Sequence, residues 1–399
     1  MPRPLRVLVD ARMMLGRFSG VARVVTRLVD GMAARDDFRV AVLCGDEPFE
    51  PWSRRTDFDI VQSDFSRADR APARRMWWEG TRLSTWIRGA GVDLFHATWN
   101  HGIPARCPVP ALLTIHDLIP WDDSGGGLSR SFQSACYRRS VRASARRARL
   151  IATVSEFSRQ QVLHRLGATS VGVFVAHNGV DIPSSGPPRP NEGADVPYVL
   201  YVGGHEDRKN IETILAAMET YWKRFDRRLE LHLTGREETL SKRAREALIC
   251  IRREGHDPPI RFLGTPDDQT LARQYASATA LLMLSRAEGF GLPVLEAMSH
   301  GCPVIAARTS ALPEVVGNAG LLVEPHHAEG VAEAIHLIKS CPQEAERFAG
   351  LGRLRAASFS WDRSIDAYHA LYLKAVGQAA SSVADSSHPV TFPSPAILQ

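Results

Sequence analysis

The chain has 399 residues, of which 44% are hydrophobic and 23% are charged, and its formal net charge is +5. This length exceeds one ordinary hydrophobic core and predicts two globular domains. No apolar run approaches the ~18 residues of a membrane-spanning helix, and the N-terminal strand-like segment is too short and too quickly polar for a signal peptide. These observations favour a cytoplasmic protein over an integral membrane or exported one.

In the first half of the chain, short apolar runs alternate with segments long enough for helices. The runs are Arg6–Asp10, Val40–Cys44, Asp93–Ala97, Ala111–His116, Leu150–Val154 and Val173–Ala176. Alternating strands and helices with nearly continuous apolar strands indicate a parallel sheet that helices cover on both faces. We therefore predict an N-terminal α/β domain over residues 1–184.

A segment rich in proline, serine and glycine separates the two halves, and we predict a linker over residues 185–196. The same alternation then resumes and predicts a second α/β domain over residues 197–360. Its strand-like runs are Tyr198–Gly203, Leu229–Thr234, Ile260–Gly264, Ala280–Ser285, Val304–Ala307 and Leu321–Glu324.

A final amphipathic helix is predicted over residues 361–376, where apolar and aromatic residues recur at helical spacing. Residues 377–399 are rich in serine, proline and alanine and show no periodicity, so we predict a disordered tail.

Arginines gather in two segments of the first half. Residues 124–155 contain seven arginines and no acidic residue, and residues 67–88 contain six more arginines together with three tryptophans. A solvated basic helix explains either cluster alone at least as well as a binding surface does, and no recognised nucleic-acid motif accompanies them. In the first cluster, helical spacing predicts one basic face, made of Arg138, Arg142, Arg146 and Arg149. The opposite, core-facing stripe is apolar and consists of Tyr137, Val141, Ala145 and Ala148.

The most informative segment is residues 287–298, in which Glu288 and Glu296 flank a Gly-Phe-Gly turn and Pro293. The apolar run before it predicts a buried strand, and a proline is favoured in the first turn of a helix. The amides at such a helix start form an anion site. Carboxylates beside a phosphate site make chemical sense if they bind hydroxyl groups, which suggests a nucleotide sugar.

This segment resembles family 4 of the retaining glycosyltransferases. Further segments resemble blocks of that family, in family order over nearly the whole chain: residues 114–118, 153–158, 178–181, 201–203, 208–210, 300–306, 309–316 and 320–325. The resemblance implies the GT-B fold, in which two Rossmann-like domains with parallel sheets face each other across an interdomain cleft. It also implies that the last helix crosses back to the N-terminal domain.

The resemblance implies a donor site in the C-terminal domain and an acceptor site in the N-terminal domain. The reaction expected is transfer of a hexose, with mannose from GDP-mannose as our best single choice, to a hydroxyl of a glycan or lipid-linked saccharide in bacterial surface polysaccharide synthesis. Because the arginine clusters lie in the acceptor half, we predict binding to an anionic membrane surface, on the inner face of the plasma membrane. We do not expect a nucleic-acid partner.

The family motif assigns donor contacts around residues 288–296. Glu296 is predicted in the first turn of its helix, where it would bind the ribose, although a carboxylate that complements the helix dipole explains it without the motif. Glu288 would bind hydroxyls of the donor sugar, and the neighbouring glycines argue against a plain surface turn. We carry over Gly289 and the amides of Phe290, Gly291 and Leu292 as donor contacts.

Basic residues elsewhere complete the predicted site. Lys209 would stabilise the diphosphate leaving group, and Arg208 either assists it, in place of the usual basic residue, or faces solvent. Asn210, which follows them, is a good N-cap residue. His116 ends a strand and would approach the donor sugar, although a His-Asp pair in isolation is more often a structural turn. Gly20, just before a helix, resembles the glycine loop that closes on the diphosphate.

We predict no metal and no cofactor besides the nucleotide sugar. The six cysteines are scattered without a C-x-x-C pair, which argues against a disulfide framework or a zinc site. Two alternatives stay open. A nucleotide-dependent oxidoreductase requires a glycine fingerprint after the first strand, which is absent. A non-catalytic GT-B protein that binds a glycan or a partner enzyme would not need Glu288, Glu296, Lys209 and His116.

Overall fold

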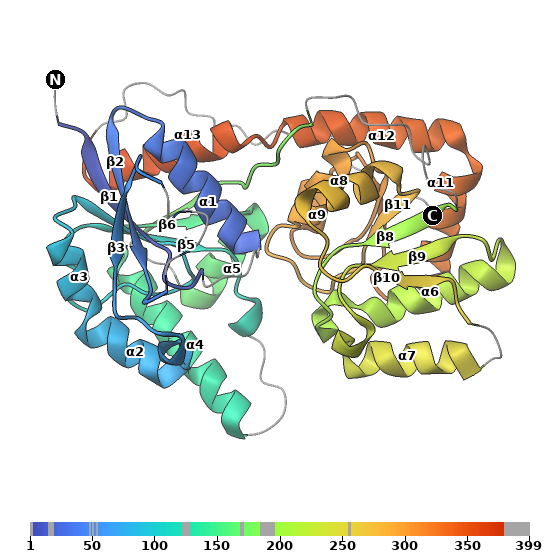
Figure 1. Ribbon diagram of the computed structural model, residues 1–399, viewed down its shortest axis with the longest axis horizontal. Helices are drawn as coiled ribbons and strands as arrows, with labels where there is room; N and C mark the ends of the chain where they lie inside the picture. Colours follow the sequence, from blue (N-terminus) through green and yellow to red (C-terminus); the bar gives the residue numbers. More distant parts are fainter. Residues whose placement is uncertain are drawn as a thin grey trace. The chain divides into compact units, whose positions relative to one another are not determined.

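The computed structural model describes residues 3–14, 20–47, 49, 52, 55–121, 128–167, 171–183, 196–253 and 257–378. These residues divide into two compact units (Figure 1). Residues 3–179 together with 361–378 form unit 1, and residues 180–360 form unit 2. Residues 185–195 of the predicted linker and 379–399 of the predicted tail lie outside the described residues.

Unit 1 is built on a seven-stranded parallel sheet with the strand order β3-β2-β1-β4-β5-β6-β7. The strands are β1 (Leu5–Asp10), β2 (Phe38–Cys44), β3 (Asp59–Gln62), β4 (Leu94–Ala97), β5 (Ala111–Ile115), β6 (Leu150–Thr153) and β7 (Gly172–Val175). The order reverses between β1 and β4. In sheets of this kind, ligands bind beyond the carboxyl ends of the strands at that switch point.

Six of these strands coincide with the predicted apolar runs, which confirms the sequence pattern for them. The edge strand β3 was missed. Its sequence, Asp-Ile-Val-Gln, has polar ends and is largely exposed, so it lacks the apolar run by which a buried strand is identified.

Helices cover both faces of the first sheet, as alternate residues of its strands show. Phe95 and Leu113 pack in one core with Val141, whereas the next residues, His96 and Thr114, contact the last helix. This alternation follows from the period-two side-chain direction of a strand. The helices of unit 1 are α1 (Gly20–Ala33), α2 (Pro72–Thr81), α3 (Leu83–Gly89), α4 (Leu128–Arg147), α5 (Glu156–Leu166) and α13 (Trp361–Ala375).

A buried polar network joins α13 to the sheet. His96 Nδ1 lies 2.8 Å from the hydroxyl of Tyr372, and His96 Nε2 lies 2.8 Å from Thr114 Oγ1. The hydroxyl of Tyr368 lies 3.2 Å from the same threonine oxygen. Burial lowers the pKa of His96 to about 3, so its imidazole is neutral at pH 7.

Unit 2 repeats the architecture with a six-stranded parallel sheet in the order β10-β9-β8-β11-β12-β13. All of these strands lie within the predicted runs: β8 (Tyr198–Tyr201), β9 (Glu230–Leu233), β10 (Ile260–Phe262), β11 (Ala280–Met283), β12 (Val304–Ala307) and β13 (Leu321–Val323). Figure 1 shows α6 and α7 together on one side of this sheet. The helices are α6 (Ile211–Arg224), α7 (Lys242–Arg253), α8 (Asp268–Ser277), α9 (Leu292–Ser299), α10 (Leu312–Val316), α11 (Ala328–Ser340) and α12 (Pro342–Ala357).

Each unit therefore has a parallel sheet with the strand order of a Rossmann-like domain, which confirms the predicted fold class. Among the described residues, no helix is both long enough and apolar enough to span a bilayer.

Candidate active site

The strand, glycine turn and helix start that the sequence predicts at residues 280–299 are all present in unit 2. β11 ends at Met283, and α9 begins at Leu292 directly after Gly291. Gly291 has a φ of 107°, and a Cβ atom there would lie 2.9 Å from Cδ2 of Leu312. A residue with a side chain would therefore meet both backbone strain and a steric clash.

The start of α9 offers backbone donors. Within the described part of the chain, the amides of Gly291 and Leu292 have no hydrogen-bond acceptor, whereas the Gly291 carbonyl accepts from the amide of Val294. The Phe290 ring is buried and packs edge-on against Phe359, with ring centroids 5.8 Å apart. Any contact of Phe290 with a donor would therefore involve its backbone.

Glu288 lies between two basic side chains. Its Oε1 atom is 2.6 Å from Lys209 Nζ, and its Oε2 atom is 3.5 Å from NH1 of Arg208. The Lys209 and Glu288 side chains are only 10% and 12% exposed. The structure thus brings together the three charged residues that the sequence analysis assigned to the sugar and the diphosphate, and their summed charge is +1.

The loops that carry these residues are tied together by backbone contacts. The amide of Arg286 donates to the carbonyl of Arg208 at 2.8 Å, and the amide of Glu288 donates to Ser310 Oγ at 2.9 Å. The guanidinium of Arg286 also donates to the carbonyl of Asp207 and to Glu212, both at 2.6 Å. The positions of Lys209 and Glu288 are therefore set before any ligand binds.

Asn210 has a different role from the one predicted. It occupies the N-cap position of α6, but its side chain caps no helix amide and its backbone is left-handed, with a φ of 59°. The side-chain amide donates instead to the carbonyls of Leu284 and Pro325, at 2.9 and 2.6 Å, and the side-chain oxygen accepts from Thr213. Asn210 thus joins three loops at the carboxyl edge of the second sheet.

Glu296 does not lie in the first turn of α9, which corrects the prediction. The helix begins at Leu292, so Glu296 is its fifth residue, beyond the turn where the dipole acts most strongly. The carboxylate accepts a hydrogen bond from the hydroxyl of Tyr275 at 2.8 Å. His205, which follows Gly204, is buried. Its ring nitrogens lie 2.6 Å from the Thr234 carbonyl and 2.7 Å from Thr239 Oγ1.

The other predicted site residues, His116 and Gly20, belong to unit 1. His116 follows β5, and its Nε2 atom lies 2.8 Å from the carbonyl of Thr98. Because a carbonyl only accepts, Nε2 carries the proton and Nδ1 is the acceptor nitrogen. Burial lowers the pKa of His116, so the ring is neutral at pH 7. Gly20 is the first residue of α1, and residues 15–19 before it lie outside the described residues.

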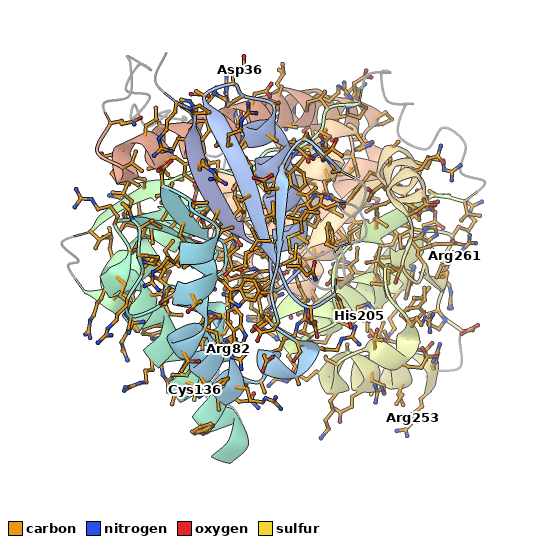
Figure 2. The ribbon with its side chains drawn as sticks, turned by 60° about the vertical axis from the view of Figure 1, so that its left-hand side comes forward. Asp36, Arg82, Cys136, His205, Arg253 and Arg261 are labelled. Carbon is orange, nitrogen blue, oxygen red and sulfur yellow. The ribbon has the colours of Figure 1, made fainter. Side chains whose placement is uncertain are left out.

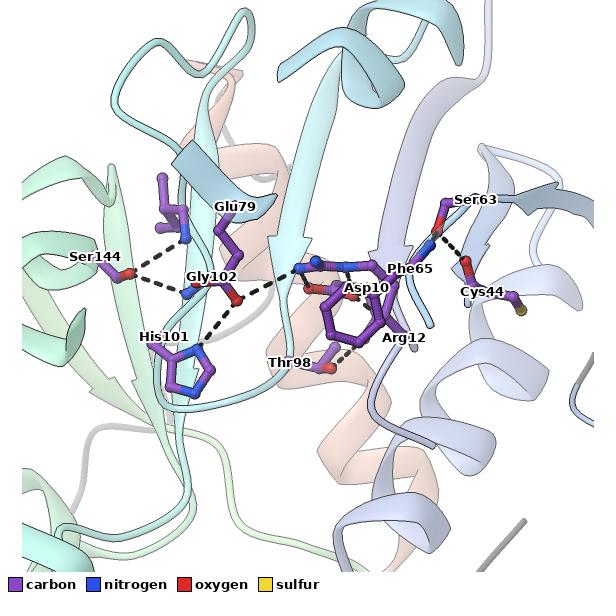
Figure 3. A network of polar contacts seen from close by, with 11 residues as sticks. Asp10, Arg12, Cys44, Ser63, Phe65, Glu79, Thr98, His101, Gly102 and Ser144 are labelled. Carbon is purple, nitrogen blue, oxygen red and sulfur yellow. Dashed lines mark hydrogen bonds and ion pairs between the residues drawn. The ribbon is translucent and has the colours of Figure 1, made fainter. Parts of the chain in front are cut away.

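A buried ion cluster that was not predicted from the sequence lies at the carboxyl edge of the first sheet (Figure 3). Arg12 pairs with both oxygens of Asp10, at 2.9 and 2.7 Å, and lies 3.8 Å from Glu79. Glu79 in turn lies 3.4 Å from His101 Nδ1, and the Arg12 guanidinium covers the Trp78 ring at 4.6 Å. Asp10 at the end of the first strand and Arg12 just after it were the available signal.

The predicted basic face belongs to α4, and the second arginine segment includes α2 and α3. The core-facing stripe of α4 is confirmed, since Val141 and Ala145 are buried. Two arginines of this face contact Trp121. Arg138 donates a hydrogen bond of 3.2 Å to its carbonyl, and the Arg142 guanidinium lies 4.7 Å from the centre of its ring. In the other arginine segment, Arg75 is buried. Figure 2 shows α2 and α4 on the same side of unit 1, near the labelled Arg82 and Cys136.

Two family models together match most of the chain. Residues 18–183 match the family described as Glycosyltransferase Family 4, and residues 196–339 match Glycosyl transferases group 1. The O-antigen chain mannosyltransferase B of Escherichia coli is 34% identical over 242 residues, which cover 56% of this chain and 61% of that protein. The MMP alpha-(1->4)-mannosyltransferase of Mycolicibacterium hassiacum is 38% identical over 118 residues, 29% of each chain. The chain thus spans less than two thirds of the length of these curated relatives.

Solved structures show the same fold. Sucrose-phosphate synthase from Thermosynechococcus elongatus has a TM-score of 0.74 and 20% identity, covering 93% of this chain and 98% of that one. Anabaena HepE in complex with UDP and glucose has a TM-score of 0.68 and 17% identity, covering 93% and 99%. The chain belongs to the family 4 glycosyltransferases, and its two Rossmann-like domains are those of the GT-B fold.

Proposed function

We propose that the protein is a retaining hexosyltransferase that uses a nucleoside diphosphate sugar and a hydroxyl of a glycan or lipid-linked saccharide. Mannose from GDP-mannose is the donor we favour, in the synthesis of a bacterial surface polysaccharide. The names of two relatives support this choice, because both are mannosyltransferases and one acts on O-antigen chains. The structures of HepE with UDP and with UDP-glucose support a nucleotide sugar of some kind as the donor.

The observation that carries the proposal is the cluster of Arg208, Lys209 and Glu288 in the same turn region as the start of α9. Two cations and the amides of Gly291 and Leu292 suit a diphosphate, whose negative charge grows as the bond to the sugar breaks. Glu288 suits the sugar hydroxyls, and it also neutralises Lys209 before the donor binds.

In the reaction we propose, the bond between the anomeric carbon and the phosphate oxygen breaks while the acceptor oxygen bonds to the same face of that carbon. The departing phosphate oxygen takes the acceptor proton, so the protein need not supply a base. Lys209 and Arg208 stabilise the departing diphosphate without a metal ion. His116, with Nε2 held by the Thr98 carbonyl, would present the neutral Nδ1 atom as an acceptor for a sugar hydroxyl.

Incubation of the purified protein with a panel of nucleotide sugars, including GDP-mannose and UDP-glucose, tests the proposal. We expect one donor to raise the melting temperature and to be hydrolysed slowly without an acceptor. Glu288→Ala should abolish both transfer and hydrolysis, whereas Glu333→Gln, at an exposed site on α11, should leave them intact. A protein that neither binds nor hydrolyses any donor would support the non-catalytic alternative.

Two further readouts test the finer parts of the reaction. NMR of the earliest product should show the anomeric configuration of the donor, and an inverted product would refute retention. Activity should survive prolonged treatment with EDTA, and a loss that Mg²⁺ restores would refute charge neutralisation by Lys209 and Arg208 alone.

We also propose that the exposed face of α2 and α4 binds an anionic membrane surface. Trp77 on α2 and Phe132 on α4 are 58% and 60% exposed, and Arg139 and Arg146 on α4 are exposed as well. Exposed aromatic side chains favour the headgroup zone, and clustered arginines attract anionic lipid.

Vesicle sedimentation tests this surface. We expect vesicles that contain phosphatidylglycerol to retain the protein at low salt and release it at high salt. Arg139→Glu combined with Arg146→Glu should weaken retention. Arg243→Glu combined with Arg253→Glu, at exposed sites on α7 of unit 2, changes the net charge equally and is the control; Arg253 is labelled in Figure 2. Equal retention of both variants would refute the proposed face.

A further inference from the structure

Tyr275 is buried beneath the donor-site helix and contacts one of its proposed functional residues. It lies in α8, is 2% exposed, and donates its hydroxyl to Glu296 Oε2 at 2.8 Å. Hydrogen bonds from a neutral donor to an ionised carboxylate are shorter and stronger than those between neutral groups. The tyrosine therefore restrains the side chain of Glu296 as well as packing in the core.

The backbone of Glu296 is also fixed, through a residue that contacts Tyr275. The Glu296 carbonyl accepts hydrogen bonds from Ser299 Oγ at 2.9 Å and from His300 Nδ1 at 2.8 Å. The His300 ring lies 5.7 Å from the Tyr275 ring, at an interplanar angle of 30°. The Tyr275 ring thus supports the end of α9 while its hydroxyl orients the carboxylate.

We propose that Tyr275 is a positioning residue that acts through Glu296 to set the affinity for the ribose of the nucleotide. The inference rests on the proposed function, in which Glu296 binds that ribose. A carboxylate has about four acceptor positions, so one hydrogen bond from Tyr275 is compatible with two more from a cis-diol. A glutamate held in one orientation loses less conformational freedom when the diol binds, and this raises affinity.

The test compares ribonucleotides with nucleotides that lack the diol. Binding of UDP and GDP and of their 2′,3′-dideoxy counterparts is measured by calorimetry for the wild type and for Tyr275→Phe. We expect Tyr275→Phe to weaken binding of the preferred ribonucleotide by about tenfold and to leave binding of its dideoxy counterpart unchanged within about twofold. A merely structural role would weaken both nucleotides equally, and that result would overturn the inference.

Tyr198→Phe is the matched control. Tyr198 is also buried in unit 2, and its hydroxyl donates to the carbonyl of Gln274, the residue before Tyr275, at 2.9 Å. Loss of this hydroxyl disturbs α8 without touching Glu296, so the preference for ribose should persist. If Tyr198→Phe reduces that preference as much as Tyr275→Phe does, the effect is a general one of α8, and the inference is overturned.

Glu296→Gln separates a failure of this inference from a failure of the proposed function. If Glu296→Gln removes the ribose preference and Tyr275→Phe does not, Glu296 retains its proposed role and Tyr275 has none. If Glu296→Gln leaves the preference intact, the proposed ribose contact is wrong, and the inference falls with it. If both residues act as one unit, the double variant should lose no more preference than Glu296→Gln alone.

Discussion

The ion pair between Lys209 and Glu288 allows a quantitative test of the candidate site. The paired atoms are 2.6 Å apart, and both side chains are nearly buried. At an effective dielectric constant of about 20, two unit charges at that separation attract by about 6 kcal/mol before the desolvation of both groups is subtracted. Arg208, 3.5 Å from the other oxygen, still stabilises Glu288 when Lys209 is removed. We therefore expect a net coupling of about 1–3 kcal/mol between the two side chains.

A double-mutant cycle of Lys209→Met and Glu288→Gln measures this coupling. Each single variant should destabilise unit 2, because the remaining charge loses its partner. The double variant should lose less than the sum of the two. Native-state hydrogen exchange of amides in β8 and β11 reports the stability of unit 2 separately from that of unit 1.

Activity should respond differently from stability. Because both residues contact the donor in the proposed reaction, the double variant should be as inactive as the single ones even though part of its stability returns. A coupling below about 0.5 kcal/mol would show that the pair is not an interacting unit. An active double variant would refute the catalytic assignment of both residues.

Three further predictions concern stability. The pKa of His96 is about 3 in the folded protein, whereas the pKa of a histidine in the unfolded chain is about 6.5. Between these two pKa values, the unfolded chain binds more protons than the folded one. Lowering the pH from 7 to 5 should therefore reduce the free energy of unfolding by about 2 kcal/mol through His96. Thermal melts at both pH values should show a smaller pH effect in His96→Gln than in the wild type, and an equal effect would contradict the assignment. Gly291→Ala should destabilise unit 2 by about 1–3 kcal/mol, because of its left-handed backbone and the contact with Leu312; hydrogen exchange in β11 that matches the wild type would count against this. Arg12→Met should cost unit 1 about 3–5 kcal/mol, because Asp10 stays buried without its partner, and urea denaturation with an unchanged midpoint would argue that the cluster adds nothing.

Local signals in the sequence were sufficient for the sheets and for the turn at Gly291. Most strands of both units are short and apolar, so their burial can be predicted from the sequence. Among the described strands, the polar edge strand Asp59–Gln62 was not predicted. Glycine next to Leu-Pro specified a helix start, although the helix begins one residue before Pro293, so Glu296 lies beyond the first turn.

Contacts between distant segments could not be predicted in the same way. The role of Asn210 depends on carbonyls at residues 284 and 325, and the partner of Glu296 is Tyr275 on another helix. The cluster around Arg12 likewise needs Glu79 and His101, which only the folded sheet brings together. The conformation of a single turn is determined by neighbouring residues, whereas these long-range contacts depend on the order of the strands in the sheet.

The return of α13 to unit 1 has a consequence for biosynthesis. Residues 3–179 are synthesised before unit 2, yet unit 1 stays incomplete until Tyr368 and Tyr372 of α13 have been synthesised. Until then, His96 and Thr114 lack the hydroxyls of Tyr372 and Tyr368, and Gly31 lacks Ile365, which packs against it in the folded protein. Within the described residues, unit 2 is the single stretch 180–360. Synthesis from the N-terminus therefore lets unit 2 finish folding before unit 1, although unit 1 begins earlier in the sequence.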